Sequence, residues 1–328
     1  MEYPSCQHIE QYLQPGKHCH LVGIGGVSMS PLAEVLHSMG LSVQGSDMND
    51  GPSVEHLRSL GIPVAIGHAA DNLGECDFVI RTAAIHDDNP EISGAVTRGI
   101  PVFERAQAWG AIMKGCKNAL CISGTHGKTT TTSMATHIFM AAQKDPTVMI
   151  GGTLQLLHSG YRVGKGDTII AESCEYCNSF LSFFPTVAVI LNVEADHLDH
   201  YSGIEEIETT FAKFMSLVGE DGTVIVCGED PHLVELAKST GRHVLSYGFA
   251  ETNDIVCVHP DVKGIQSDFI VRFEDGTEHA VEIKSNPGRH NMLNATAVLT
   301  VAHVLGLDID AAAKALSSFE GSASHLSS

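Results

Sequence analysis

The sequence of 328 residues contains no long hydrophobic run. Apolar runs such as Val187–Leu191 fall far short of the roughly 18 residues that a membrane-spanning helix needs. The amino terminus, MEYPSCQHIEQYL, also lacks the basic segment followed by an apolar core that marks a secretory signal. These absences argue against a membrane-spanning helix and against export, and they predict a cytoplasmic protein.

Positive charge is scarce. The chain has 19 Lys and Arg against 39 Asp and Glu, which gives a net charge of −20 with neutral histidines. Such an acidic surface repels nucleic-acid phosphates and anionic lipids, so nucleic-acid binding and a membrane-surface role are both disfavoured. A phosphorylated ligand would have to be held by local backbone amides, a few placed cations and a metal ion.

Low-complexity tracts and short-period repeats are also absent, and the nine cysteines are scattered. An odd number of cysteines in a long chain without a secretory signal indicates reduced thiols. Cys174 and Cys177 form one C-x-x-C pair, but without a second pair it is a weak indication of zinc or redox chemistry, and we interpret it as incidental. The hydrophobic content of 43% is typical of a globular chain, and this length favours two domains.

The first part of the chain alternates between short apolar runs and helical patterns. The run His18–Ile24 predicts a buried strand, the glycines at its end predict a turn, and Ser30–Met39 has helical periodicity. Further strands and helices are expected at Leu41–Gln44, Val54–Leu60, Val64–Ile66, Phe78–Arg81 and Asn89–Arg98. Strands and helices that alternate at this spacing predict a parallel sheet covered by helices.

The same alternation restarts near residue 118. A strand is predicted at Ala119–Ser123, followed by a turn rich in Gly and Thr and a long helix that begins near Lys128. Later segments predict more strands and helices and a small antiparallel patch with a hairpin turn at Asp275–Gly276. We therefore expect an α/β protein of two parallel-sheet domains, with the boundary near residues 107–117.

The turn after residue 123 has the composition of a phosphate-binding loop. It follows a predicted strand, opens a helix, and consists of Gly124, Thr125, His126, Gly127, Lys128, Thr129 and Thr130. Glycines let backbone N–H groups converge on phosphate oxygens, the lysine neutralises phosphate charge, and the first threonine hydroxyl can bind Mg²⁺. The usual pattern has Gly at position 122, where this chain has Ile122, so the loop is a variant.

Acidic residues follow two other predicted strands. Glu172 and Glu175 come after the strand Thr168–Ala171, and the turn Asn192–His200 contains Glu194, Asp196, His197, Asp199 and His200. The carboxyl ends of parallel strands are where ligands bind in open α/β folds. Because Mg²⁺ takes one or two carboxylates together with phosphates and water, these residues predict a nucleotide triphosphate site with bound magnesium.

These motifs together resemble the ATP-dependent Mur ligases of peptidoglycan synthesis. The resemblance rests on GTHGKTT, on ILNVEADHLDHY (Ile190–Tyr201) and on PGRHNMLNATA (Pro287–Ala297). The segments Gly23–Leu36 and Thr82–Ile92 are similar to the muramate–alanine branch of that family. The resemblance runs from about residue 17 to 321. It implies a Rossmann-like UDP-sugar-binding domain over residues 1–110 and a P-loop-type central ATPase domain over 111–321, with a disordered tail over 322–328.

The resemblance implies that ATP phosphorylates the carboxylate of UDP-N-acetylmuramate and that the amine of L-alanine then attacks the acyl phosphate. The residues that would bind ATP are Gly124, Thr125, His126, Gly127, Lys128, Thr129, Thr130, His290, Asn291 and Asn294. Those that would bind magnesium are Thr129, Glu175 and His197, and those with a catalytic role are Lys128, Glu175 and His197. Those along the UDP-sugar would be Gly25, Gly26, Ser46, Asp47, Thr82 and Arg105.

Other functions stay open at this point. The family has a third, carboxy-terminal domain that this chain lacks, so we expect weak ligation by this polypeptide alone. A ligase that recycles a ready-made peptide onto UDP-N-acetylmuramate and a non-catalytic nucleotide-binding module are alternatives. A third alternative is an NAD-dependent oxidoreductase, because the first glycine turn with Asp47 imitates a dinucleotide fingerprint, although Ser28 stands at its third glycine.

Overall fold

The computed structural model describes residues 8–154, 159–174, 176–194, 201, 203–285, 287–319 and 322–323. The chain divides into two compact units, Met1–Ile112 and Met113–Ser328. The division falls inside the helix α4 (Arg105–Lys114). Each unit is built around its own sheet.

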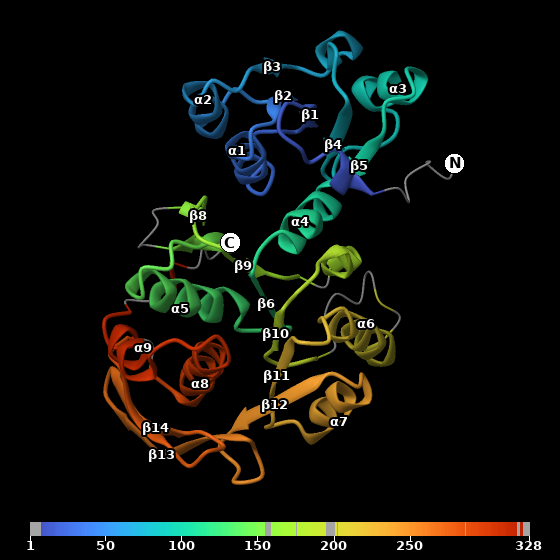
Figure 1. The fold of residues 1–328 in the computed structure, drawn as a ribbon. Coiled ribbons are helices and arrows are strands. Elements are labelled where there is room, and N and C mark those ends of the chain that lie inside the picture. The colour runs from blue at the N-terminus through green and yellow to red at the C-terminus, as the bar shows by residue number, and fades with distance from the viewer. Residues whose placement is uncertain are drawn as a thin grey trace. The chain divides into compact units, whose positions relative to one another are not determined.

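The first unit contains a five-stranded parallel sheet in the order β3-β2-β1-β4-β5 (Figure 1). The sequence predicts a parallel sheet here and the first four strands, but neither β5 nor the strand order. Its strands are β1 (His18–Val22), β2 (Ser42–Asp47), β3 (Val64–Ile66), β4 (Phe78–Arg81) and β5 (Val102–Glu104). Its helices are η1 (Ile9–Gln11), α1 (Ser30–Ser38), α2 (Pro52–Ser59), η2 (Ala70–Leu73) and α3 (Pro90–Thr97). The order in which successive strands are added to the sheet reverses between β1 and β4, and ligands bind at such a switch point in open α/β sheets.

The second unit has an 11-stranded sheet in its described residues. The order is β15-β14-β13-β12-β11-β10-β6-β9-β7-β16, with β8 paired to β7. The parallel part consists of β6 (Asn118–Ser123), β7 (Thr147–Leu154), β9 (Thr168–Glu172), β10 (Val187–Ile190), β11 (Thr223–Cys227) and β12 (His243–Gly248). The predicted antiparallel patch is formed by β13 (Ile255–Lys263), β14 (Gln266–Arg272) and β15 (Glu278–Ile283), while β8 is Ser159–Arg162.

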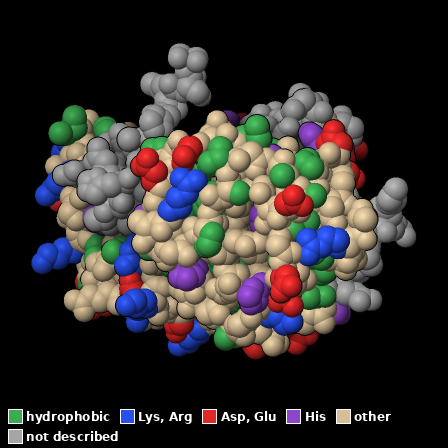
Figure 2. Space-filling view, turned by 90° about the horizontal axis from the view of Figure 1, so that it is seen from above, with side chains coloured by type: hydrophobic (Ala, Val, Ile, Leu, Met, Phe, Trp, Pro, Cys, Tyr) green, Lys and Arg blue, Asp and Glu red, His purple; other side chains and the backbone are tan. Residues whose placement is uncertain are grey.

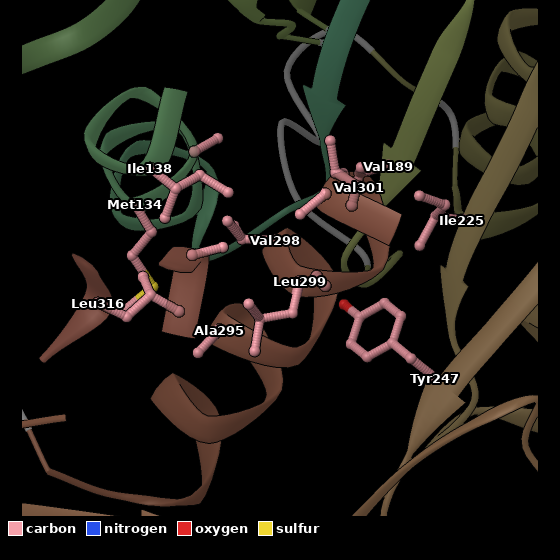
Figure 3. Packing of buried hydrophobic residues seen from close by; sticks show 14 of the residues in the cluster. Met134, Ile138, Val189, Ile225, Tyr247, Ala295, Val298, Leu299, Val301 and Leu316 are labelled. Carbon is pink, nitrogen blue, oxygen red and sulfur yellow. The ribbon is translucent and has the colours of Figure 1, made fainter. Parts of the chain in front are cut away.

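Helices cover both faces of this second sheet. On one face lie α5 (Lys128–Ala141), α8 (Arg289–Val304) and α9 (Ile309–Leu316), and on the other lie α6 (Ile204–Ser216) and α7 (Pro231–Ser239) (Figure 1). The short helix η3 (Tyr176–Ser182) contacts α6. The helix α8 is buried over most of its surface because α5, α9 and the sheet all pack against it. Figure 3 shows Ala295, Val298 and Leu299 of α8 within this core.

The structure differs from the sequence prediction at the carboxyl end. We expected residues 322–328 to be disordered, but Ser322–Ala323 forms β16 and pairs antiparallel with β7. The edge of β7 offers backbone N–H and C=O groups with which an extended segment of almost any sequence can pair, which explains why composition gave no signal. Residues 324–328 lie outside the described residues.

Figure 2 shows acidic and basic side chains interspersed over the described surface in view. Within the part of the chain that the structure describes, no helix is both long enough and apolar enough to cross a membrane.

Candidate functional site

The predicted phosphate loop lies between β6 and α5, at the carboxyl edge of the second sheet. Gly124 has a φ of +141° and Gly127 a φ of +84°, conformations that side chains other than glycine rarely adopt. A Cβ on Gly124 would lie 3.1 Å from the backbone of Asn192, so the loop and the turn after β10 are in close contact. Ile122 stands where the usual phosphate-loop pattern has a glycine. It still belongs to β6, and its side chain is buried in the core.

The two functional side chains of this loop have defined partners. The Lys128 ammonium donates to the carbonyl oxygens of Gly124 and Thr125, so it folds over the loop. The Thr129 hydroxyl donates to Glu172 Oε1 at 3.1 Å. The loop therefore combines a cation, a hydroxyl and a carboxylate at the start of α5, and Thr130 occupies the same first turn.

The turn after β10 holds the loop through Asn192. The His126 amide N–H donates to Asn192 Oδ1 at 2.7 Å, and Asn192 Nδ2 donates to the His126 carbonyl at 3.1 Å. The Thr125 N–H donates to the Asn192 carbonyl at 3.1 Å. Sequence reasoning placed Asn192 in this turn but did not assign it a role. No local signal could have assigned one, because the contact arises only from β6 and β10 being neighbouring parallel strands, so that the residues that follow them meet.

The oxygen donors suit magnesium. Thr129 and Glu172 supply one hydroxyl and one carboxylate side by side, and Mg²⁺ in proteins commonly keeps one or two carboxylates with phosphate oxygens and water. Two residues that we expected to bind the metal, Glu175 and His197, lie outside the described residues. Among the described residues there is no cluster of three or more His, Cys, Asp or Glu side chains that could hold a metal alone.

The start of α8 reaches the phosphate loop. Asn294 lies against Gly127, since a Cβ on that glycine would be 3.2 Å from Asn294 Oδ1. Asn294 Nδ2 donates to Asn291 Oδ1 at 3.0 Å, and both side chains are buried. His290 is exposed in the first turn of α8. The structure thus brings Asn294 and Asn291 to the loop from a segment more than 160 residues downstream of it.

The first unit has its own glycine turn, between β1 and α1. The Gly25 N–H donates to Asp47 Oδ2 at 2.9 Å, and the Gly26 N–H donates to the Gly23 carbonyl at 3.1 Å. A Cβ on Gly23 would lie 3.3 Å from the methyl group of Thr82, so the ends of β1 and β4 are adjacent. Asp47 is therefore occupied in holding the turn, unlike the free acid that a dinucleotide fingerprint would present to a ribose.

Arg105 adds a cation to this turn. Its guanidinium donates to the Ser28 hydroxyl, and Trp109 Nε1 donates to the Ser28 carbonyl at 3.4 Å. Burial lowers the pKa of Arg105, and the Glu104 carboxylate, which forms an ion pair with Arg81, offsets this only in part. Ser30, in the first turn of α1, has a buried hydroxyl without a hydrogen-bond partner among the described residues. A half-buried cation beside a helix amino terminus favours an anionic ligand.

Beneath this turn, Ser46 belongs to a buried polar cluster around Glu91. The Ser46 hydroxyl donates to Glu91 Oε2 at 2.6 Å, and Asn72 Nδ2 donates to Oε1 at 2.6 Å. His20 Nε2 lies 3.1 Å from Oε2. Burial alone would raise the pKa of Glu91, but hydrogen bonds from His20, Ser46 and Asn72 outweigh it and lower the pKa to about 2. The Ser46 side chain is thus fully buried and supports the carboxyl edge from below.

Comparison with known proteins identifies the family to which this chain belongs. Residues 18–117 match the model of the Mur ligase family catalytic domain, and residues 122–302 match that of the Mur ligase middle domain. The chain belongs to the Mur ligase family. This Mur ligase is 40% identical over 313 residues to a UDP-N-acetylmuramate–L-alanine ligase of Clostridium tetani, covering 94% of this chain and 68% of the relative.

Other relatives agree with that membership. A UDP-N-acetylmuramate–L-alanine ligase of Clostridium botulinum (strain Loch Maree) is 43% identical over 87% of this Mur ligase and 62% of the relative. The crystal structure of a UDP-N-acetylmuramate-alanine ligase from Thermotoga maritima superposes with a TM-score of 0.75 at 32% identity, covering 93% of this chain and 69% of that one. The chain thus spans 62 to 68% of the length of these two curated relatives.

A murein peptide ligase is also similar in structure. The UDP-N-acetylmuramate:L-alanyl-γ-D-glutamyl-meso-diaminopimelate ligase from Neisseria meningitides superposes with a TM-score of 0.80 at 25% identity. It covers 93% of this Mur ligase and 98% of that chain. The family match over residues 18–117 includes the segment that imitated a dinucleotide fingerprint, so the oxidoreductase alternative is wrong.

Proposed function

We propose that this Mur ligase uses ATP to join L-alanine to the carboxylate of UDP-N-acetylmuramate. The observation that carries the proposal is the phosphate loop, in which Lys128 and the Thr129–Glu172 pair share one edge of the sheet. We infer the two substrates from the names of the curated relatives. A phosphate loop with this donor set serves phosphoryl transfer, which an amide-forming ligase needs to activate its carboxylate.

Each unit would bind a different substrate. In the second unit, the loop from Gly124 to Thr130 would hold the phosphates of ATP, with Asn291 and Asn294 beside it and His290 on the nucleoside side. In the first unit, the turn at Gly25 and Gly26, with Arg105 and Thr82, would hold the UDP diphosphate. Local cations and amides are essential here because the chain carries a net charge of −20.

The chemistry follows from the charges. A carboxylate is a poor electrophile, so one of its oxygens attacks the γ-phosphorus of ATP, and the bond to the β-γ bridging oxygen breaks to give an acyl phosphate and ADP. The amine nitrogen then attacks the acyl carbon, the C–O bond to phosphate breaks, and the nitrogen loses a proton to yield the amide. Lys128 would leave the carbonyls of Gly124 and Thr125 to neutralise the transferring phosphoryl group.

Magnesium would supply further charge neutralisation between the phosphates. Thr129 and Glu172 are the described residues that fit its first coordination sphere or its bound water. We propose Glu175 and His197 as additional ligands from the family resemblance. We propose that the ligase acts in the cytoplasm, because an odd number of scattered cysteines indicates reduced thiols.

The proposal is tested by an ADP-release assay with UDP-N-acetylmuramate, L-alanine and Mg·ATP. Lys128→Met should abolish ADP release that depends on both substrates, because the cation on the transferred phosphoryl is lost. Lys238→Met, at an exposed position in the last turn of α7, is the matched control and should behave as the wild type. Absence of Mg·ATP binding to the folded wild-type protein in calorimetry would contradict the proposal.

A second candidate is ligation of a ready-made peptide, since the TM-score of 0.80 to the Neisseria peptide ligase exceeds the 0.75 to the Thermotoga enzyme. The assay distinguishes the two through the amine. Faster ADP release with L-alanyl-γ-D-glutamyl-meso-diaminopimelate than with L-alanine would favour the peptide ligase. If ATP and UDP-N-acetylmuramate both raise the melting temperature but neither L-alanine nor the tripeptide supports ADP release, a non-catalytic nucleotide-binding module is favoured.

A further inference from the structure

One side chain, that of Asn192, takes both hydrogen-bonding groups of the His126 backbone. Its Oδ1 accepts the His126 N–H at 2.7 Å, and its Nδ2 donates to the His126 carbonyl at 3.1 Å. A side-chain amide carries a donor and an acceptor side by side, so it pairs with a backbone residue as a strand neighbour would. The turn after β10 thereby extends the pairing of β10 with β6 past the end of both strands.

This pairing decides which amides of the loop can face a phosphate. The N–H groups of Thr125 and His126 are both bonded to Asn192. From Thr125 onward, the donors left for a ligand therefore begin at Gly127, the residue before α5, where the first N–H groups of a helix have no intrahelical partner. The positive φ at Gly127 turns the chain between these two groups of amides.

We propose that Asn192 is a positioning residue, which holds the phosphate loop in its nucleotide-binding shape before the nucleotide arrives. The proposal rests on the proposed function, because it takes a nucleotide triphosphate as the ligand of the loop. A loop containing two glycines has many accessible backbone conformations. The apparent affinity for the nucleotide equals the intrinsic affinity multiplied by the fraction of molecules whose loop has the binding conformation. Asn192 selects that conformation without touching the ligand.

The expected loss is partial, because other bonds between the two segments survive removal of the side chain. The Thr125 N–H still donates to the backbone carbonyl of residue 192, and the Glu194 N–H still donates to Thr125 Oγ1 at 2.9 Å. Two side-chain hydrogen bonds are lost. We expect Asn192→Ala to weaken Mg·ATP binding about tenfold, which corresponds to a competent fraction of about one tenth.

The test measures the Kd of Mg·ATP by calorimetry for the wild type, Asn192→Ala, Asn192→Asp and a matched control, Asn118→Ala. Asn118 also makes a side-chain hydrogen bond, to Thr168 Oγ1 at 3.1 Å, but it lies at the opposite end of β6. Asn118→Ala should leave the Kd unchanged even where its melting temperature falls as much as that of Asn192→Ala. Asn192→Asp keeps the acceptor but adds negative charge near the triphosphate, so it should bind more weakly than Asn192→Ala at low salt, with the gap narrowing as salt screens the charge.

Amide hydrogen exchange supplies a readout that needs no ligand. In the nucleotide-free protein, the peptide containing residues 124–127 should exchange faster in Asn192→Ala than in the wild type, and equally in Asn118→Ala. A Kd for Asn192→Ala within twofold of the wild type, or an equal loss in both alanine variants, would overturn the positioning role. Failure of the wild type itself to bind Mg·ATP would overturn the proposed function instead, and the exchange comparison would still decide whether Asn192 fixes the loop.

Discussion

Replacing Glu91 with glutamine should destabilise the first unit by about 3 kcal/mol at pH 7. The carboxylate is fully buried, and it accepts hydrogen bonds from the Ser46 hydroxyl, the Asn72 amide and the backbone N–H of Ala69. Its pKa is lowered from 4.5 to about 2. Each unit of such a shift is worth about 1.4 kcal/mol, so the ionised form contributes roughly 3 kcal/mol to folding.

The sign of the pH dependence follows from the direction of the shift. Because the pKa of Glu91 in the folded state lies below its unfolded value, the stabilisation is complete above about pH 5 and is lost as the pH falls toward 2. Between pH 7 and pH 3, the free energy of unfolding of the wild type should therefore fall by roughly 2 kcal/mol more than that of Glu91→Gln. Glutamine also places an NH₂ group against the donors from Ser46, Asn72 and Ala69, which leaves at least one of these three without an acceptor.

Trp109 makes this prediction measurable. It is the only tryptophan of the chain, and it is 2% exposed in the first unit, so its fluorescence follows unfolding of that unit in urea. The exposed Glu75→Gln is the matched control and should change stability by less than about 0.5 kcal/mol. A difference between wild type and Glu91→Gln that is the same at pH 3 and pH 7 would refute the reasoning, as would a loss below 1 kcal/mol at pH 7.

Two further predictions concern the two sites, and a third concerns a buried thiol. Gly127→Ala should weaken Mg·ATP binding at least tenfold, since it strains a φ of +84° and pushes a methyl group to 3.2 Å from Asn294; unchanged calorimetric affinity would contradict the geometry. UDP-N-acetylmuramate should change the emission of Trp109, whose indole N–H bonds to the carbonyl of Ser28 in the glycine turn, whereas L-alanine alone should not. Burial raises the pKa of the Cys121 thiol to about 12, so it should resist iodoacetamide at pH 8 in the native protein and react, by mass spectrometry, only after denaturation.

Much of this protein was determined by local sequence. The apolar runs and glycine turns predicted the parallel sheets, because a buried strand and a sharp turn each leave a signature in a few consecutive residues. The loop from Gly124 to Thr130 was predicted for the same reason, since its glycines, lysine and threonine act through neighbouring backbone.

Only the tertiary structure decided which distant residues meet. Nothing in the composition of the turn after β10 marks Asn192 as the partner of His126, because that contact follows from the pairing of β10 with β6. Likewise, Ser46 was predicted to lie along a substrate, and the structure buries its hydroxyl against Glu91 of α3. Hydrogen bonds across a sheet depend on strand order and register, and these are properties of the whole fold rather than of any short segment.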